Sequence, residues 1–365
     1  QCLHYFADTG LEVVLIEKGR IASGSTAANT ALIQYAGDKM FGPLIHTFGE
    51  VKAAQHLKLC EEAINEIEAV CTTLPNSADF SRRDSLYYAS TEEDVRSLQE
   101  EIVLLQKHGF KVDYWTGEQV RAHYPIQAPA ALFYKNDAEL NPVKFTHGLL
   151  ESAHRKNVRI YEQTECKGHK QEKDAVVFYT KNQHSIRAKH VVFACGYVNQ
   201  TFKSDKNAVL SSSYTIVTKP VAGPDIWANR ILIWETARPY VYLRTTPDNR
   251  IIIGGLDEST TIAEERDRHV LHKKDQLLQE LHKRFPNIQA EAEYYLGAFY
   301  GGTHDGLPIL GIYEDYPRCT FLNAYGDNGL VYSMVLARIV RDLLTKGSSP
   351  FSELYMQTKW IHAEV

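Results

Sequence analysis

The stretch 13-VVLIEKG-19 decides the fold of this chain. Its four consecutive apolar residues, Val13–Ile16, are typical of a β-strand that is buried on both faces of a parallel sheet. Before this strand, Leu3 and Phe6 lie one helical turn apart, and Gly10 is a natural helix stop. A helix, a turn and a buried strand in this order form half of a nucleotide-binding unit.

An acid, Glu17, ends this strand. A carboxylate in that position accepts hydrogen bonds from both hydroxyls of an adenosine ribose. The alternative is a solvated surface acid beside Lys18. A full unit carries a glycine-rich turn about 20 residues before the acid, and counting back from Glu17 passes Gln1. We therefore expect the first strand and its glycine turn to precede Gln1.

The composition is that of a globular chain without a polyanionic partner. The 365 residues are 44% hydrophobic and 23% charged, which is enough for two domains or one large one. The net charge is -5 and no long block of like charge occurs, so we expect neither nucleic acid nor an anionic membrane as a partner. Apolar runs stay short of the roughly 18 residues of a membrane span, so no span is expected.

The cysteines show no metal-binding pattern. They form no CxxC pair, and no histidine cluster lies near them at ligand spacing: Cys2, Cys60, Cys71, Cys166, Cys195 and Cys319. We therefore expect no metal site and interpret them as reduced core thiols of a cytoplasmic protein. The sequence does not specify the oligomeric state.

Helical patterns come first, a β-rich block follows, and strand and helix return at the end. Helices are expected over residues 50–72, 91–109, 141–157, 271–285 and 328–345. Residues 210–260 predict antiparallel strands with turn formers between them. This order favours two interleaved domains in an α/β fold, α+β overall.

Two loops of small residues allow a ligand to approach the backbone closely. In 22-ASGSTAANTAL-32, the hydroxyls of Ser25 and Thr26 suit phosphate oxygens, although a plain polar loop that caps a helix is the alternative. Ala194 and Gly196 follow the buried strand 190-HVVFACG-196, where a tight turn is the alternative.

The final helix directs its positive end at whatever precedes it. Gly329 opens this apolar helix, so its free N–H groups favour a ligand that develops negative charge. A flavin suits this place because, on reduction, its negative charge concentrates near N1 and the C2 carbonyl.

Aromatic and basic residues of the β-rich block are candidates for a substrate cavity. Trp234, Tyr240 and Tyr242 alternate along predicted strands, and Arg238 and Arg244 suit a substrate carboxylate. The alternatives are core aromatic side chains and structural or surface arginines.

Six segments, taken in order, resemble the FAD-dependent D-amino-acid oxidase superfamily, and in particular its glycine oxidase and sarcosine oxidase branch. The resemblance extends from about residue 3 to residue 355. The segments are 13-VVLIEKGRIASGSTAANTALIQY-35, 141-NPVKFTHGLLESAHRKNVRIYE-162, 190-HVVFACGY-197, 240-YVYLRTTPDNRIIIGG-255, 301-GGTHDGLPILG-311 and 325-YGDNGLVYS-333.

The resemblance implies two domains with the flavin ring between them. A Rossmann-like FAD-binding domain would comprise residues 1–75, 140–205 and 296–365, without its first strand and glycine loop. A substrate domain built on a large, mostly antiparallel sheet would comprise residues 76–139 and 206–295.

The family's cofactor contacts carry over to the residues that match its motifs. At the adenosine end these are Glu17, Lys18 and Cys166, and Ala194 and Gly196 at the strand end are added as candidates for close approach of the backbone. Ser25 and Thr26 would meet the pyrophosphate. The flavin would contact Thr30, Ala31 and Leu32, and its pyrimidine edge Gly326, Asp327, Asn328, Gly329 and Leu330.

Three features depart from the family pattern besides the glycine fingerprint. Phe299 stands where glycine oxidases carry an arginine for the substrate carboxylate, which argues against a free amino acid. Asp327 precedes Asn328 where many relatives have glycine, so a carboxylate lies beside a flavin that gains negative charge. No cysteine precedes 303-THDGLP-308, where sarcosine oxidases tether their flavin, so we expect non-covalent FAD.

The leading hypothesis is an FAD-dependent oxidoreductase that oxidises the C–N bond of an amine or amino acid, a small-molecule substrate, by hydride transfer to flavin N5. Arg244 and Tyr242 are the substrate-facing candidates. One alternative is a catalytically inactive remnant or binding module of the same fold. The other is an FAD-dependent dehydrogenase of a hydroxyl substrate, a glycerol phosphate or a 2-hydroxy acid.

Overall fold

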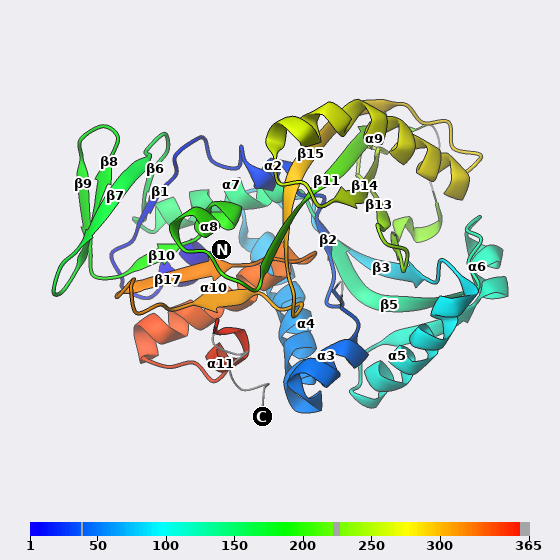
Figure 1. Cartoon of the computed structure of the whole chain (residues 1–365), viewed down its shortest axis with the longest axis horizontal. Helices are drawn as coiled ribbons and strands as arrows, with labels where there is room; N and C mark the ends of the chain where they lie inside the picture. Colours follow the sequence, from blue (N-terminus) through cyan, green and yellow to red (C-terminus); the bar gives the residue numbers. More distant parts are fainter. Residues whose placement is uncertain (38, 222–226, 358–365) are drawn as a thin grey trace.

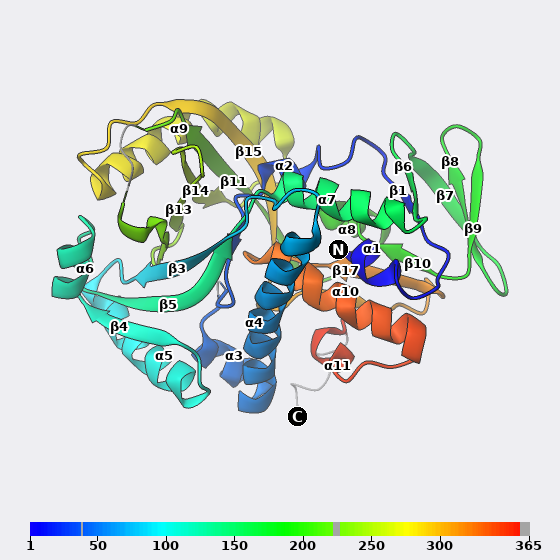
Figure 2. The ribbon, with the colours of Figure 1, turned by 180° about the vertical axis from the view of Figure 1, so that it is seen from behind.

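The computed structural model describes residues 1–37, 39–221 and 227–357. Figure 1 shows two lobes, one around a large sheet and one around smaller sheets and the final helix, with α4 between them. The chain crosses between the lobes several times, and Figure 2 shows the same arrangement from behind. The interleaving predicted from the order of patterns is therefore present.

The predicted long helices are confirmed, with their ends within a few residues of the expected ones except at the start of α9. The α-helices are α1 Cys2–Phe6, α2 Ser25–Ala28, α3 Phe41–Phe48, α4 Glu50–Thr73, α5 Val95–Lys107, α6 Gly117–His123, α7 Pro142–Arg155, α8 Asn199–Phe202, α9 Ala263–Arg284, α10 Gly329–Lys346 and α11 Ser352–Tyr355. Short 3₁₀ turns cover Glu92–Asp94, Gly196–Val198 and Ala228–Arg230.

A nine-stranded sheet forms the larger lobe. Its strand order is β15-β11-β14-β13-β12-β3-β5-β2, and β4 pairs with β5. Its strands are β2 Leu32–Ile33, β3 Ser81–Tyr88, β4 Val112–Thr116, β5 Ala130–Glu139, β11 Ala208–Thr218, β12 Leu232–Glu235, β13 Val241–Thr245, β14 Ile251–Glu258 and β15 Ala292–Thr303. Every pair is antiparallel except β12 with β3, so the mostly antiparallel sheet is confirmed.

Three small sheets form the other lobe. One pairs β1 with β6 in parallel, one has the order β10-β17-β16, and one is the antiparallel set β7-β8-β9. The strands are β1 Val14–Ile16, β6 Arg159–Tyr161, β7 Cys166–Gln171, β8 Val176–Thr180, β9 Ser185–Ala188, β10 Val191–Phe193, β16 Ile309–Gly311 and β17 Cys319–Asn323.

The prediction that the first strand is buried on both faces is wrong for the described residues. All three residues of β1 are half-buried: Leu15 packs against α1 and α7, whereas Val14 and Ile16 belong to no hydrophobic cluster of the described residues. The strand itself, its parallel pairing and the acid at its end are as predicted.

Two hydrophobic cores lie on the two faces of the large sheet. One core joins the sheet to α4 and α10 and includes Ile64, Tyr87 and Trp234, and the other joins it to α9. On α9, Leu277 and Leu281 are buried against the sheet, whereas Leu271 is 58% exposed. Strand alternation therefore sends one face of the sheet toward the final helix.

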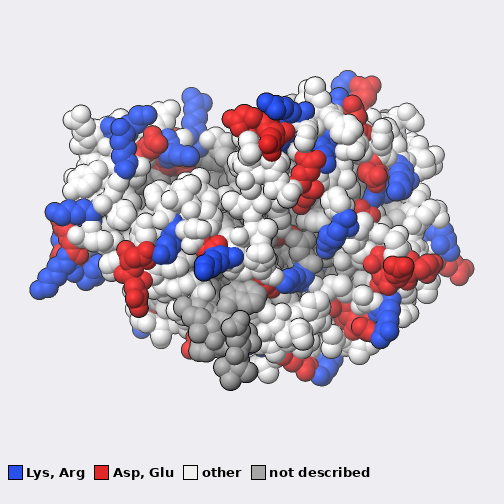
Figure 3. All heavy atoms as spheres, in the orientation of Figure 1, with Lys and Arg blue, Asp and Glu red and all other residues white. Residues whose placement is uncertain are grey.

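The outer surface carries mixed charge. Figure 3 shows acidic and basic side chains interspersed over the visible face. Within residues 1–37, 39–221 and 227–357, no helix combines the length and the apolar character needed to cross a membrane.

A buried carboxylate fixes the start of α3. Glu101 on α5 is 3% exposed, and it accepts hydrogen bonds from the backbone N–H groups of Phe41 at 2.6 Å and Gly42 at 3.1 Å. These are N–H groups of the first helical turn, which have no partner inside the helix. Burial raises the pKa of Glu101, and the two N–H groups oppose that rise.

We predict that Glu101→Ala lowers the free energy of unfolding by about 1–3 kcal/mol, because two buried N–H groups lose their acceptor. Urea unfolding measures the change. The neighbouring Glu100→Ala is the control, since Glu100 is 64% exposed and paired only with Arg96 on the surface. Its effect should stay below about 1 kcal/mol, and equal effects of the two variants would contradict the assignment.

Candidate functional site

A cavity of about 150 Å³ lies between the start of α10 and one face of the large sheet. Three parts of the chain enclose it: the loop around α2 and β2, the strands β11 to β15, and the turn before α10. The lining residues are Ser25, Ala28, Asn29, Thr30, Leu32, Gln34, Tyr197, Ser213, Thr215, Trp234, Tyr240, Tyr242, Ala298, Phe299, Tyr300, Ala324, Gly326, Asp327 and Gly329.

The structure brings many of the predicted site residues together here. The predicted cofactor and substrate residues that line the cavity are Ser25, Thr30, Leu32, Gly326, Asp327, Gly329 and Tyr242. Of the aromatic candidates, Trp234 and Tyr240 line it as well. Segments separated by some 300 residues in sequence therefore meet at one place.

Other predicted residues lie close behind this lining. Ala31 is buried with φ 53°, and Asn328 is buried at the start of α10. Thr26 and Leu330 are half-buried neighbours of lining residues in the sequence. None of these four forms part of the cavity wall.

The predicted adenosine end lies apart from the cavity. Glu17 accepts a hydrogen bond from the Gly19 N–H at 2.8 Å, which closes the turn after β1. The charges of Glu17, Cys166 and Lys18 act on the Cys195 thiol. These groups therefore lie within electrostatic reach of one another, beside Ala194 and Gly196 in the exposed turn after β10.

Tyr242 leans across the neighbouring strand into the cavity. On β14, a Cβ at Gly254 would collide with the Tyr242 hydroxyl and lie 2.9 Å from the Thr215 hydroxyl. Only glycine leaves this room. Burial, and then the charge of Asp257, raise the pKa of Tyr242, while hydrogen bonds with Thr30 and other hydroxyls oppose the rise. Tyr242 is therefore a neutral phenol at physiological pH.

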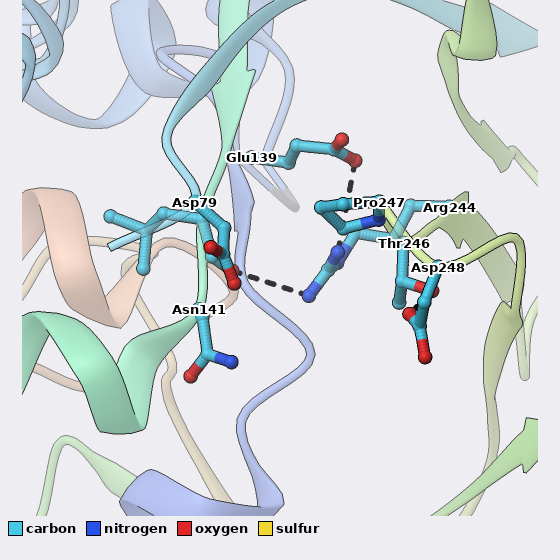
Figure 4. Close-up of a pocket in the computed structure, with 8 residues that line it drawn as sticks. Asp79, Glu139, Asn141, Arg244, Thr246, Pro247 and Asp248 are labelled. Carbon is cyan, nitrogen blue, oxygen red and sulfur yellow. Dashed lines mark hydrogen bonds and ion pairs between the residues drawn. The ribbon is translucent and has the colours of Figure 1, made fainter. Parts of the chain in front are cut away.

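Arg244 lies in a different hollow from Tyr242. Figure 4 shows it between Glu139 and the loop that carries Thr246 and Asp248, in a hollow of about 100 Å³. Its guanidinium forms an ion pair with Glu139 at 3.7 Å and donates to the Thr30 carbonyl and to the Leu140 carbonyl. Arg244 thus holds the backbone of a lining residue rather than facing the cavity.

Asp327 is the one acidic side chain of the cavity wall, and no lysine or arginine lines that wall within the described residues. Its Oδ1 accepts a hydrogen bond from the Tyr300 hydroxyl at 2.5 Å and another from Tyr240 at 3.4 Å. The carboxylate is therefore fixed by side chains from the sheet.

Gln34 and the network behind it are not predicted from the sequence. Gln34 Nε2 donates to the Ser85 hydroxyl at 3.3 Å, and that hydroxyl donates to Asp137 at 2.5 Å. All three residues are at most 6% exposed. A lone glutamine has no pattern that marks it, whereas Ser213 and Thr215 could have been found from their period-two alternation on β11.

The start of α10 has unsatisfied polar groups. The helix has no side-chain cap, and the buried Asn328 Oδ1 has no hydrogen-bond partner in the described structure, although its Nδ2 donates to the Ala36 carbonyl at 2.8 Å. Gly326 adopts φ +115°, and a Cβ there would lie 2.8 Å from the Tyr332 ring. This turn leaves helix N–H groups beside the cavity.

Comparison with known proteins relates this arrangement to a family. The model of the family described as FAD dependent oxidoreductase matches residues 2–343. A Bacillus subtilis (strain 168) protein named "Putative Rieske 2Fe-2S iron-sulfur protein YhfW" is 24% identical over 364 residues, which cover 96% of this chain and 67% of that protein.

Solved structures share the fold. L-proline dehydrogenase from P. horikoshii has a TM-score of 0.77 at 20% identity, covering 100% of this chain and 95% of that one. Glycine oxidase from Geobacillus kaustophilus has a TM-score of 0.75 at 18% identity, and the match covers 96% of this chain and 92% of that one. L-alpha-glycerophosphate oxidase from Mycoplasma pneumoniae, solved with FAD bound, has a TM-score of 0.73 at 13% identity, and the match covers 96% of this chain and 93% of that one.

The cavity suits FAD, the cofactor of this family. The orphaned Asn328 Oδ1, the free N–H groups of α10 and the glycine at position 326 match a polar heterocycle that gains negative charge.

Across residues 1–37, 39–221 and 227–357, no group of three or more His, Cys, Asp or Glu side chains is placed to hold a metal ion.

The buried Asp137 predicts a pH dependence of stability. Burial raises its pKa to about 7 from an unfolded value near 3.8, against hydrogen bonds from Ser85 and the Tyr35 N–H. Of the nearby charges, Asp84 adds to the rise and Arg82 opposes it. The folded state therefore keeps a proton that the unfolded state releases, so stability falls between pH 4 and pH 7.

We predict that Asp137→Asn removes this loss, because the amide does not titrate. Urea unfolding at pH 5 and pH 8 should show a smaller decrease for Asp137→Asn than for the wild type. Asp113→Asn, at an exposed site on β4, is the control and should keep the wild-type slope. If the free energy of unfolding of Asp137→Asn falls with pH as steeply as that of the wild type, the raised pKa of Asp137 is contradicted.

Proposed function

Because the chain belongs to the FAD dependent oxidoreductase family, we propose that it oxidises the C–N bond of an amine or amino acid by hydride transfer to flavin N5. The substrate loses a hydride from carbon and a proton from nitrogen, and water hydrolyses the resulting imine. Bound FAD supplies the hydride acceptor, and oxygen or another acceptor takes the electrons afterwards.

The observation that carries this proposal is the charge of the cavity wall. Its only charged side chain is Asp327, and it offers no basic side chain among the described residues. A phosphate is bound mainly by arginine, lysine or clustered N–H groups, so this wall suits an amine better than a glycerol phosphate. A 2-hydroxy acid is disfavoured for the same reason, and within the proposed class the wall suits an amine without a free carboxylate better than a free amino acid.

The cavity residues would position the substrate carbon rather than exchange protons with it. Tyr242 stays neutral, and the hydroxyls of Ser213 and Thr215 line the same wall. Correct placement of the reacting atoms supplies much of the rate in such a reaction. We assign Tyr242 to the substrate side, and Arg244 to holding Thr30 in place.

The cofactor would extend from this cavity toward β1. Glu17 and Lys18 would meet the adenosine ribose, and Ser25 and Thr26 the pyrophosphate. Residues 326–330 would hold the flavin edge, where the α10 N–H groups favour negative charge.

We predict that the purified full-length protein carries FAD and is yellow, and that an anaerobic amine bleaches its flavin absorbance. A panel of amines and amino acids is compared with glycerol 3-phosphate and 2-hydroxy acids by absorbance at the flavin band. Absence of flavin would overturn the proposal. Bleaching by the hydroxyl compounds alone would support the alternative dehydrogenase.

We predict that Gly326→Ala weakens FAD binding about 10- to 100-fold, because the new Cβ meets Tyr332 and the positive φ is strained by about 1–3 kcal/mol. Quenching of FAD fluorescence on titration into apoprotein measures the affinity. Gly347→Ala is the control, since Gly347 has φ +80° at the other end of α10 with open space around it. Gly347→Ala should lower the free energy of unfolding but leave the affinity for FAD unchanged. Equal FAD affinities of the Gly326→Ala and Gly347→Ala variants would contradict the assignment.

A further inference from the structure

Trp234, a residue of the cavity wall, has an indole N–H without an acceptor among the described residues. The side chain is 4% exposed and stacks on Tyr87 with 3.9 Å between ring centroids, which fixes the ring. Its Nε1 is buried and has no acceptor within the described structure. By contrast, the indole N–H of Trp227 donates to the Ile231 carbonyl at 2.9 Å. A buried donor without an acceptor costs about 1–3 kcal/mol, which a ligand oxygen at Trp234 would recover.

Gln34 adds an oriented amide to the same wall. Its Nε2 donates to Ser85, whose own hydroxyl proton goes to Asp137 above about pH 7, where that carboxyl is ionised. This chain of donors sets which end of the amide is left for a ligand, namely the carbonyl oxygen Oε1. Ser85 and Tyr87 lie two residues apart on β3 and therefore on the same face of the sheet, about 7 Å from each other. The Gln34 amide and the Trp234 ring thus face the cavity from adjacent places.

The charge of the wall decides which oxygen suits Trp234. Asp327 makes the cavity negative, and none of its described lining residues is basic. An uncharged carbonyl therefore suits this donor better than a carboxylate, which would be repelled and would lack a cationic partner. Phe299, in the cavity wall, adds no charge of its own.

We propose that the substrate is an amine that also carries an uncharged carbonyl, as an α-amino amide does. Trp234 donates to the carbonyl oxygen, and Gln34 Oε1 accepts a hydrogen from the amine nitrogen. This rests on the proposed function and narrows its substrate class. Trp234 and Gln34 are the residues that determine specificity.

The probe is 2-aminoisobutyramide, which has no hydrogen on its α-carbon and so binds without being oxidised. Two matched compounds complete the series: tert-butylamine lacks the carbonyl, and 2-aminoisobutyrate replaces the amide by a carboxylate. Binding to FAD-loaded full-length protein is followed by the flavin difference spectrum and by the indole ¹⁵N–¹H signals of the four tryptophans. The signal lost in Trp234→Phe identifies Trp234.

We predict that the amide shifts the Trp234 indole signal saturably and binds at least about 10-fold tighter than both comparators. Trp234→Phe keeps the stacked ring and should weaken amide binding about 5- to 100-fold, the equivalent of one lost hydrogen bond of about 1–3 kcal/mol. Gln34→Leu should weaken all three amines. Trp227→Phe is the matched control and should leave every affinity unchanged.

The wild-type indole signal does not depend on whether a variant folds. An unmoved Trp234 signal, or tighter binding of 2-aminoisobutyrate than of the amide, overturns this inference. If the Trp234 signal does not move but amines bleach the flavin, the proposed function stands and only the role of Trp234 and Gln34 is wrong. If the protein binds no FAD, both the proposed function and this inference are wrong.

Discussion

One backbone hydrogen bond joins the two halves of the site. The Gly326 N–H donates to the Gly301 carbonyl at 2.7 Å, which ties the turn before α10 to β15. Both residues are glycines for steric reasons: a Cβ at Gly326 would meet the Tyr332 ring, and one at Gly301 would collide with the Tyr197 ring. The two glycines thus leave room for the Tyr332 and Tyr197 rings at the point where this hydrogen bond ties the turn before the final helix to the large sheet. The positive end of that helix and the polar face of that sheet share the cavity as a result.

Because side chains alternate along each strand, one face of the large sheet packs a hydrophobic core and the other face lines the cavity. On β12 and β13, Ile233 and Leu243 belong to the core under α9, while Trp234 and Tyr242 face the final helix. Since side chains alternate with period two, the same strands supply a dry core on one side and a polar cavity on the other. Stability and ligand binding therefore depend on one register, and a slip of one residue would exchange them.

The sequence predicted the segments of the site better than the contacts of its residues. Small-residue loops, an acid after a strand and a glycine at a helix start are local patterns, and the structure has each of these elements, while their roles toward a cofactor stay predictions. Arg244 was predicted to face substrate, yet its partners Glu139 and Thr30 lie more than 100 residues away, and no local pattern identifies them. The burial of β1 was wrong because burial depends on what packs over each face of the strand rather than on the apolar run itself. Gln34 was missed because its role comes from Ser85 and Asp137, which pairing of distant strands brings beside it.

The position of Asp327 resolves the conflict between its charge and a flavin that becomes more negative. Hydroxyls of Tyr300 and Tyr240, both from the sheet side, hold the carboxylate, so it belongs to the wall of the sheet rather than to the helix start. Hydrogen bonds of this kind stabilise the charged form and spread its charge. In the proposed arrangement, the free N–H groups of α10 would remain for the ring, while the carboxylate would give the substrate side a negative potential. Under the proposed function, a cavity of this polarity would attract an amine and repel an anion, so a second substrate group would be recognised by neutral donors and acceptors rather than by an arginine.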